Sequence, residues 1–122
     1  MVDKINRLER GINELNKLDE SNVARLKELL FDVSEDFYVH FIENFGDIFS
    51  RNCLDMKTRE LVTIGIIATL GYAPERLKTH IKGALKFGAS KEELIEVIMQ
   101  VSSYAGFPAA VNGILMLKQV LK

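Results

Sequence analysis

The chain of 122 residues has little of what disulfide-rich, redox-active and β-sheet proteins use. It contains one cysteine, two prolines and no tryptophan. A single cysteine excludes a disulfide framework, a cysteine-rich zinc site and an intrachain dithiol couple. The scarcity of proline, Thr, Tyr and Trp, beside abundant Leu, Ile, Glu and Lys, favours helices over strands.

An excess of charge of one sign is also absent. Sixteen basic and seventeen acidic residues give a formal charge of −1, so no global field recruits nucleic acid, and none is expected as a partner. The hydrophobic content of 48% with 27% charged residues excludes a disordered or collagen-like chain. The length predicts a single domain over residues 1–122 that can bury about two-thirds of its open-chain surface.

The sequence does not begin with the apolar run of a secretory signal. Its first residues, MVDKINRLERG, are charged and helical in pattern, which predicts a cytoplasmic protein. Residues 97–117 carry no charge and are numerous enough to span a bilayer. They include several polar residues and the break Gly106-Phe107-Pro108, so we predict a buried helix–turn–helix and no membrane partner. Such burial in a small chain predicts a partner subunit.

Apolar residues recur at helical spacing along almost the whole chain. In the more acidic first half the spacing predicts three helices, with Ser21 or Asn22 capping the second and Ser34 the third. Gly46 is expected to end the third helix, leaving a short piece around Ile48. The second half, with four acidic and seven basic residues over 61–122, is expected to hold most of the core.

Four further helices are predicted there, each with its own start or stop signal. The signals are an Asp55 N-cap, Pro74 in a first turn, a capping box at Ser90 and Glu93, and a break at Gly106. The predicted helices cover residues 56–71, 74–88, 90–105 and 108–121. Because residues 61–70 are apolar on every side, we expect the first of these helices to be central and buried.

Glu60 and His80 are the leading candidates for chemistry. Glu60 lies one turn into the apolar helix, where burial can raise a carboxyl pKa as a general acid or base requires. The other interpretation is a first-turn acid that is favoured by the helix dipole and paired with Arg59. His80 has the small or apolar neighbours Leu77 and Ala84 at helical spacing, so a ligand could approach its ring. It could equally be a half-buried histidine that makes one structural hydrogen bond.

Other candidates have simpler interpretations. Cys53, ahead of the Asp55 cap, could be a reactive thiol or a small buried hydrophobe. Lys78 begins a row of lysines that is typical of a solvated face, although Arg76 with one lysine could bind a carboxylate. His40 is interpreted as a packing or interface histidine. No metal-ligand spacing and no phosphate-binding glycine loop occur, so neither a metal site nor a nucleotide site is predicted.

Two segments of the second half carry motifs of a known family. The first is LDMKTRELVTIGIIATLG at residues 54–71, which opens with L-D-x-K-x-R-E-L. The second, at residues 74–113, contains H-x-x-x-A-L-x-x-G-A-S-x-E-E and closes with Y-A-G-x-P-A-A-x-N. The ordered set covers about half of the chain and resembles the carboxymuconolactone decarboxylase family, with a family core at about residues 50–115.

The resemblance implies an all-α fold of six to seven helices, shared with the alkylhydroperoxidase D proteins, and an intertwined homotrimer or homohexamer. The peroxidase branch of this group carries Glu and then Cys-x-x-Cys-x-x-x-His. With the histidine placed on His80, the cysteine positions fall on Ala73 and Arg76, so both thiols of the peroxide cycle are missing. A peroxiredoxin-type antioxidant activity is therefore the disfavoured alternative, although Glu60 and His80 match the proton-handling pair.

The decarboxylase branch lacks the dithiol and converts 4-carboxymuconolactone to an enol-lactone and carbon dioxide without a cofactor. The resemblance implies that His80 donates the proton and that Glu60 orients it or relays the proton. Chemical plausibility adds Arg59 or Arg76 as the anchor for a small carboxylate substrate. A third possibility is an oligomeric binding protein that keeps the fold without the activity.

Overall fold

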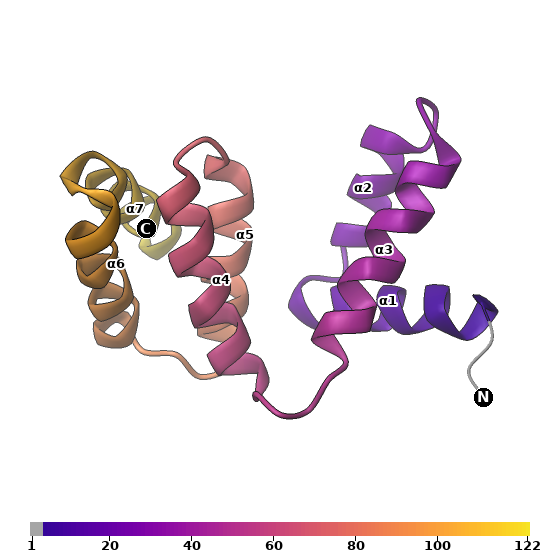
Figure 1. Cartoon of the computed structure of the whole chain (residues 1–122), viewed down its shortest axis with the longest axis horizontal. Helices are drawn as coiled ribbons and strands as arrows, with labels where there is room; N and C mark the ends of the chain where they lie inside the picture. The colour runs from indigo at the N-terminus through magenta and orange to yellow at the C-terminus, as the bar shows by residue number, and fades with distance from the viewer. Residues whose placement is uncertain (1–3) are drawn as a thin grey trace. The chain divides into compact units, whose positions relative to one another are not determined.

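Helices make up all the regular structure over residues 4–122, the part of the chain that the computed structural model describes (Figure 1). Side chains are described from residue 7 onward. The all-α prediction is confirmed. The seven helices are α1 (Lys4–Leu18), α2 (Asn22–Leu30), α3 (Glu35–Phe49), α4 (Met56–Leu70), α5 (Pro74–Lys86), α6 (Lys91–Ala105) and α7 (Phe107–Leu121).

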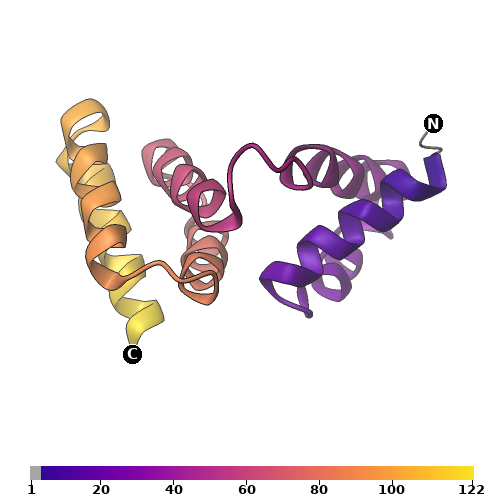
Figure 2. The same ribbon diagram turned by 90° about the horizontal axis from the view of Figure 1, so that it is seen from below.

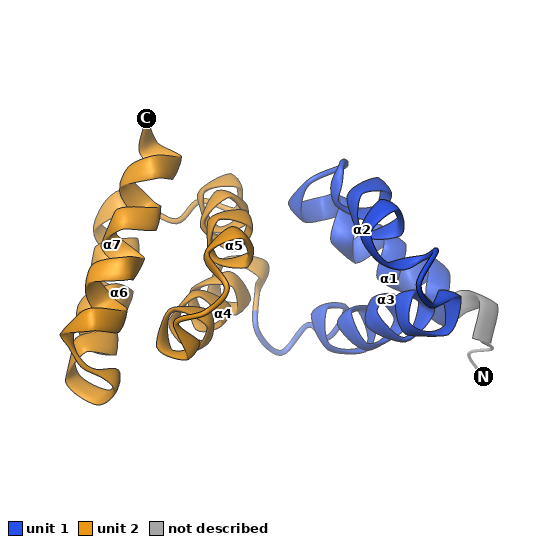
Figure 3. Ribbon diagram, turned by 90° about the horizontal axis from the view of Figure 1, so that it is seen from above, with its two compact units in different colours: residues 1–54 blue, residues 55–122 orange. Residues whose placement is uncertain are grey.

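The helices form two compact units, residues 1–54 and residues 55–122 (Figure 3). Unit 1 holds α1–α3 around a small core of Leu15, Leu26, Tyr38 and Ile42. Unit 2 holds α4–α7 around a larger core, which includes Ile64, Ile81, Leu94 and Ile98. The prediction that the second half carries most of the core is therefore confirmed.

In unit 1 two glycines allow α1 and α3 to cross closely. A Cβ atom on Gly11 would overlap the backbone carbonyl of Ile42, and one on Gly46 would lie 2.5 Å from the Cα of Gly11. The prediction that Gly46 ends the third helix was wrong, since α3 continues to Phe49. Gly46 stays helical because its missing side chain makes room for α1, which offsets its poor helix propensity.

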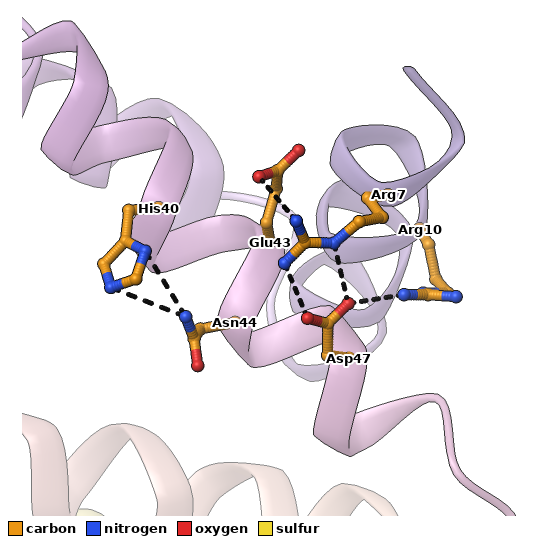
Figure 4. Close-up of polar contacts among 6 residues, drawn as sticks. All are labelled: Arg7, Arg10, His40, Glu43, Asn44 and Asp47. Atoms are coloured by element: carbon orange, nitrogen blue, oxygen red, sulfur yellow. Dashed lines mark hydrogen bonds and ion pairs between the residues drawn. The ribbon is translucent and has the colours of Figure 1, made fainter. Parts of the chain in front are cut away.

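Ion pairs also join α1 to α3 (Figure 4). Arg7 donates to both carboxylate oxygens of Asp47, with Nη2 2.6 Å from Oδ2, and Arg10 reaches the same carboxylate. These hydrogen bonds, with that from Arg7 first, hold the pKa of Asp47 below its ordinary value. His40 lies apart from this cluster, exposed on α3, with its ring 3.4 Å from the amide of Asn44.

The helices of unit 2 begin and end within one or two residues of the predicted bounds, and the largest difference is at α5, which ends at Lys86 and not at residue 88. The Asp55 side chain accepts from Thr58 N at 2.8 Å, and Ser90 and Glu93 form the capping box of α6. Gly71 follows α4 with a φ of 78°, in the left-handed region that favours glycine. Two views show α6 and α7 side by side, next to the pair α4 and α5 (Figure 2).

The central helix α4 is covered on one face only. Its buried stripe is Glu60, Ile64 and Ala68, whereas Val62, Ile66 and Leu70 are 50%, 57% and 52% exposed. The expectation that residues 61–70 are buried all round is wrong for a single chain. Within unit 2 the helices α5, α6 and α7 pack on α4, and they bury only one stripe of it. None of the described helices is long and apolar enough to cross a membrane.

Candidate functional site

Glu60 and His80 meet between α4 and α5. His80 Nδ1 lies 2.8 Å from Glu60 Oε1. Glu60 is fully buried and the His80 side chain is 13% exposed. The two helices are joined by a connection of three residues, so they pack as a hairpin that brings the fifth residue of α4 to the middle of α5. The structure therefore places the two leading candidates in direct contact.

This contact orients the imidazole ring. With Glu60 ionised, Nδ1–H donates and Oε1 accepts, so the carboxylate sets the orientation of the ring. A carboxylate that holds an imidazole in one orientation is an arrangement that general acid–base chemistry can use.

The second oxygen of Glu60, Oε2, is buried, and none of the described residues donates a hydrogen bond to it. Leaving a buried acceptor unsatisfied costs about 1–3 kcal/mol. Glu14 Oε1 in unit 1 is buried in the same way, so it is the contact with His80 that distinguishes Glu60.

The two arginines proposed as carboxylate anchors lie on the same helices as the pair. Arg59 precedes Glu60 on α4 and is half-buried. Arg76, also half-buried, lies four residues before His80 on α5, which is one turn away on the same side of the helix. Both cations are near the pair in the chain, and their role in binding stays a prediction.

The remaining candidates lie elsewhere. Cys53 is exposed in the segment before α4. Lys78 is paired with Glu75 at 2.9 Å and lies 3.2 Å from the side-chain oxygen of Gln119, so this lysine is engaged with its neighbours. Among the described side chains, no group of three His, Cys, Asp or Glu is arranged to hold a metal ion.

A cavity of about 210 Å³ opens between α4, α5 and α7. Ala73, Pro74 and Leu77 line it from α5 and the residue before it, and Asn112 lines it from α7. Glu60 and His80 are not among its lining residues. Asn112 is a polar residue of this lining. The sequence indicates it only as the last position of the Y-A-G-x-P-A-A-x-N motif, without a role in a cavity.

Comparison with known proteins identifies the group to which this arrangement belongs. A family model described as the carboxymuconolactone decarboxylase family matches residues 35–119. The chain belongs to that family. The match includes the expected core at 50–115 and also takes in α3, so it covers parts of both units. The prediction of a single domain over residues 1–122 stays a prediction.

Three similar proteins show how the chain compares with individual sequences. It is 39% identical over 107 residues to a 4-carboxymuconolactone decarboxylase of Acinetobacter baylyi, which covers 86% of this chain and 78% of that protein. It is 46% identical to an uncharacterized protein of Paracoccus denitrificans over 53% of this chain and 49% of that protein. It is 28% identical to a nitrosuccinic acid decarboxylase of Metarhizium robertsii over 63% of this chain and 53% of that protein.

Proposed function

We propose that the protein is a cofactor-independent decarboxylase of a small carboxylated lactone or a related carboxylate, with Glu60 and His80 as its proton-handling pair. The observation that carries this proposal is the 2.8 Å contact of His80 with Glu60, a carboxyl group with no exposed surface. A buried carboxylate that orients an imidazole is the arrangement that general acid–base chemistry requires.

The proposed reaction balances without an oxidant or a reductant. The bond between the ring carbon and the carboxylate breaks, and carbon dioxide leaves. The electron pair passes through the ring double bond to the lactone carbonyl oxygen and forms a dienolate. His80 then gives the Nε2 proton to the ring carbon beside the carbonyl, and the dienolate collapses to the enol-lactone. Solvent restores the proton to His80.

Glu60 acts through His80 in this scheme. It holds the ring by Nδ1, so that Nε2 is the atom that would deliver the proton to the dienolate. The substrate's own carbonyl accepts the electron pair, so the step does not call for a cofactor. Arg59 or Arg76 would bind a carboxylate of the substrate, for which a guanidinium offers paired donors.

The names of two relatives support the class of reaction. One is a 4-carboxymuconolactone decarboxylase and the other a nitrosuccinic acid decarboxylase. Both names describe the loss of carbon dioxide from a small carboxylated compound, although the compounds differ. The two names therefore support decarboxylation as the reaction, and they do not select one substrate.

The test compares the two histidines of the chain. With 4-carboxymuconolactone as substrate, we expect His80→Gln to lower kcat by about 100-fold or more, the range typical of a lost general acid. His40→Gln, which changes an exposed histidine of unit 1, is the matched control and should keep full activity. Lactone consumption and carbon dioxide release are measured together with the melting temperature. Equal activity of the two variants would contradict the proposal.

We also propose that the active form is a homotrimer or homohexamer. Unit 2 exposes apolar side chains along α4 and on the α6–α7 pair, where Met99, Tyr104 and Phe107 are 57%, 89% and 73% exposed. Large exposed apolar patches mark interaction sites in folded proteins. Because these faces are uncharged, a second copy of the chain covers them without leaving a buried charge unpaired.

A further inference from the structure

The ends of α6 and α7 in unit 2 form an apolar groove that basic residues surround. Ile95, Ile114, Leu117 and Leu121 form its apolar lining, and the groove has a volume of about 310 Å³. Its remaining lining residues are Lys91, Lys118 and Lys122, and no Asp or Glu is among them. We call this feature the lysine-rimmed groove. It lies on residues that the proposed decarboxylation does not use.

Unit 1 exposes a segment with the complementary character. Residues 31–37 run from the end of α2 into the first turn of α3 and include three exposed acidic residues, Asp32, Glu35 and Asp36. Beside these acids in the chain, Val33 is 85% exposed and Phe37 is 54% exposed. We call this segment the acidic tip. It presents apolar side chains to water among carboxylates, and the groove presents an apolar floor among lysines.

The charges of the two units have the same complementarity. Residues 1–54 contain eleven acidic and seven basic residues, a formal charge of −4, whereas residues 55–122 contain six acidic and nine basic residues, a formal charge of +3. The chain as a whole is nearly neutral, so this separation is visible only when the units are considered one at a time. Opposite charges of this size favour and orient the encounter of unit 1 of one copy with unit 2 of another.

We propose that the acidic tip of one copy docks in the lysine-rimmed groove of a second copy of this chain. Val33 and Phe37 would pack on the apolar floor, and the carboxylates of the tip would face Lys91 and Lys118. A contact between two different surfaces is heterologous, so it repeats from copy to copy and can close into a ring.

This contact adds to the assembly through apolar faces that is proposed above. A tip of seven residues is small beside the roughly 20–30 residues a side of a stable interface. It therefore strengthens and orients an assembly that the uncharged faces of unit 2 also hold. Because decarboxylation is measured separately, failure of this contact is distinguishable from failure of the proposed function.

Charge reversal tests the contact. One variant reverses the tip, with Asp32→Lys and Glu35→Lys, and another reverses the groove, with Lys91→Glu and Lys118→Glu. Matched controls reverse two exposed acids outside the tip, with Glu9→Lys and Glu20→Lys, and two exposed lysines outside the groove, with Lys82→Glu and Lys86→Glu. Analytical ultracentrifugation over a concentration series reports the assembly of each purified full chain, and circular dichroism reports its fold.

We expect each reversed variant to need about tenfold more protein than the wild type for half-assembly, because like charges then face each other. The control variants should assemble like the wild type. Mixing the tip-reversed with the groove-reversed variant should restore assembly, since each then offers the other an opposite charge. A chain carrying both reversals should also assemble.

Three results would overturn the proposal. The first is unchanged assembly of both reversed variants. The second is restoration in the chain with both reversals but not in the mixture, which would show that the tip and the groove meet within one chain. The third is a groove that binds dodecanoate in isothermal titration calorimetry, weakened by Lys118→Glu, with assembly unaffected by either reversal. That result would assign the groove to a small amphipathic acid instead of a second copy.

Discussion

Two buried glutamates show how differently the two units treat a carboxyl group. In unit 1, Glu14 is buried, and its Oε2 lies 2.8 Å from the ammonium of Lys17, a side chain that is half in solvent. In unit 2, Glu60 is buried more completely, and its Oε1 contacts a histidine instead. A lysine partner only balances the charge of a carboxylate, whereas a histidine partner can pass a proton on. Both glutamates are buried, so burial does not distinguish them. The histidine partner of Glu60 is what makes it the candidate for proton transfer.

The units also differ in how they hold their helices together. Unit 1 relies on a close glycine crossing and on the pairs of Asp47 with Arg7 and Arg10. Unit 2 relies on helix caps and a continuous apolar core. Unit 1 should therefore respond to changes of backbone space and of charge, and unit 2 to changes of its core and of its exposed apolar faces.

The largest expected effect separates the two glutamates. Glu60→Gln should lower the decarboxylation rate by about 100-fold or more, because the His80 ring loses the carboxylate that orients it. Glu14→Gln should keep the rate of the wild type. Steady-state kinetics with 4-carboxymuconolactone measure the rates of both variants. A pair of variants with equal rates would place the chemistry outside the Glu60–His80 pair.

Assembly is expected to depend on unit 2. Ile66→Glu places a charge on the exposed apolar face of α4, and burying an unpaired charge in an interface typically costs several kcal/mol. We expect this variant to sediment as a smaller species than the wild type at micromolar concentration. Lys82→Glu, on an exposed position of α5, is the control. A wild-type chain that is a stable, folded 14 kDa monomer at that concentration would refute the oligomer.

A glycine-to-alanine substitution should lower the free energy of unfolding in unit 1 but not in unit 2. Gly46→Ala forces a methyl group into the backbone of α1, and overpacking of this kind typically costs about 1–3 kcal/mol or more. Gly65→Ala is the control in unit 2, where the nearest atom to an added Cβ, a Val97 methyl carbon, is 3.6 Å away. Because alanine favours helix by about 0.5–1 kcal/mol over glycine, this control should unfold no more easily than the wild type. Urea unfolding followed by circular dichroism measures both changes.

A smaller effect should follow the pH. The Arg7 hydrogen bond holds the pKa of Asp47 below its ordinary value of 3.8. The carboxylate therefore stabilises the fold above that value, and this contribution is lost as the pH falls through the lower, folded-state pKa. Asp47→Asn should unfold more easily than the wild type at neutral pH, and the difference should disappear in acid. A difference that persists in acid would show that charge is not its source.

For the last variant, Cys53→Ser, we expect no change of activity. Because Ala73 and Arg76 occupy the thiol positions of the peroxidase branch, Cys53→Ser should leave peroxide consumption with a dithiol reductant unchanged and near background. Rapid consumption that is lost in this variant would identify Cys53 as a peroxidatic thiol and reverse the choice between the two branches.

Much of the fold was predictable because its signals are local. Asp55, Ser90 and Glu93 act within one turn of their own helices, so their caps could be identified from spacing alone. The prediction that Gly46 ends a helix failed because this glycine makes room for α1, which lies more than thirty residues away in the chain. No local pattern shows that crossing. The exposed face of α4 misled for a similar reason, since the sequence shows that a helix is apolar but not what covers it.

The candidate site was predictable in its members and not in its surroundings. Glu60 and His80 could be identified from their helix positions and from the family motifs, and the structure places them in contact. The cavity beside Asn112 and the orphaned Oε2 of Glu60 depend on how three helices pack, which spacing within one helix does not determine.

The short connection between α4 and α5 has a consequence for the order in which the molecule forms. Glu60 and His80 are only twenty residues apart in the chain, and they meet within a single helical hairpin. Closing so short a loop costs little chain entropy, and contacts between near neighbours in sequence form early in folding. The proton-handling pair can therefore come together while a subunit is still folding, before any second copy arrives.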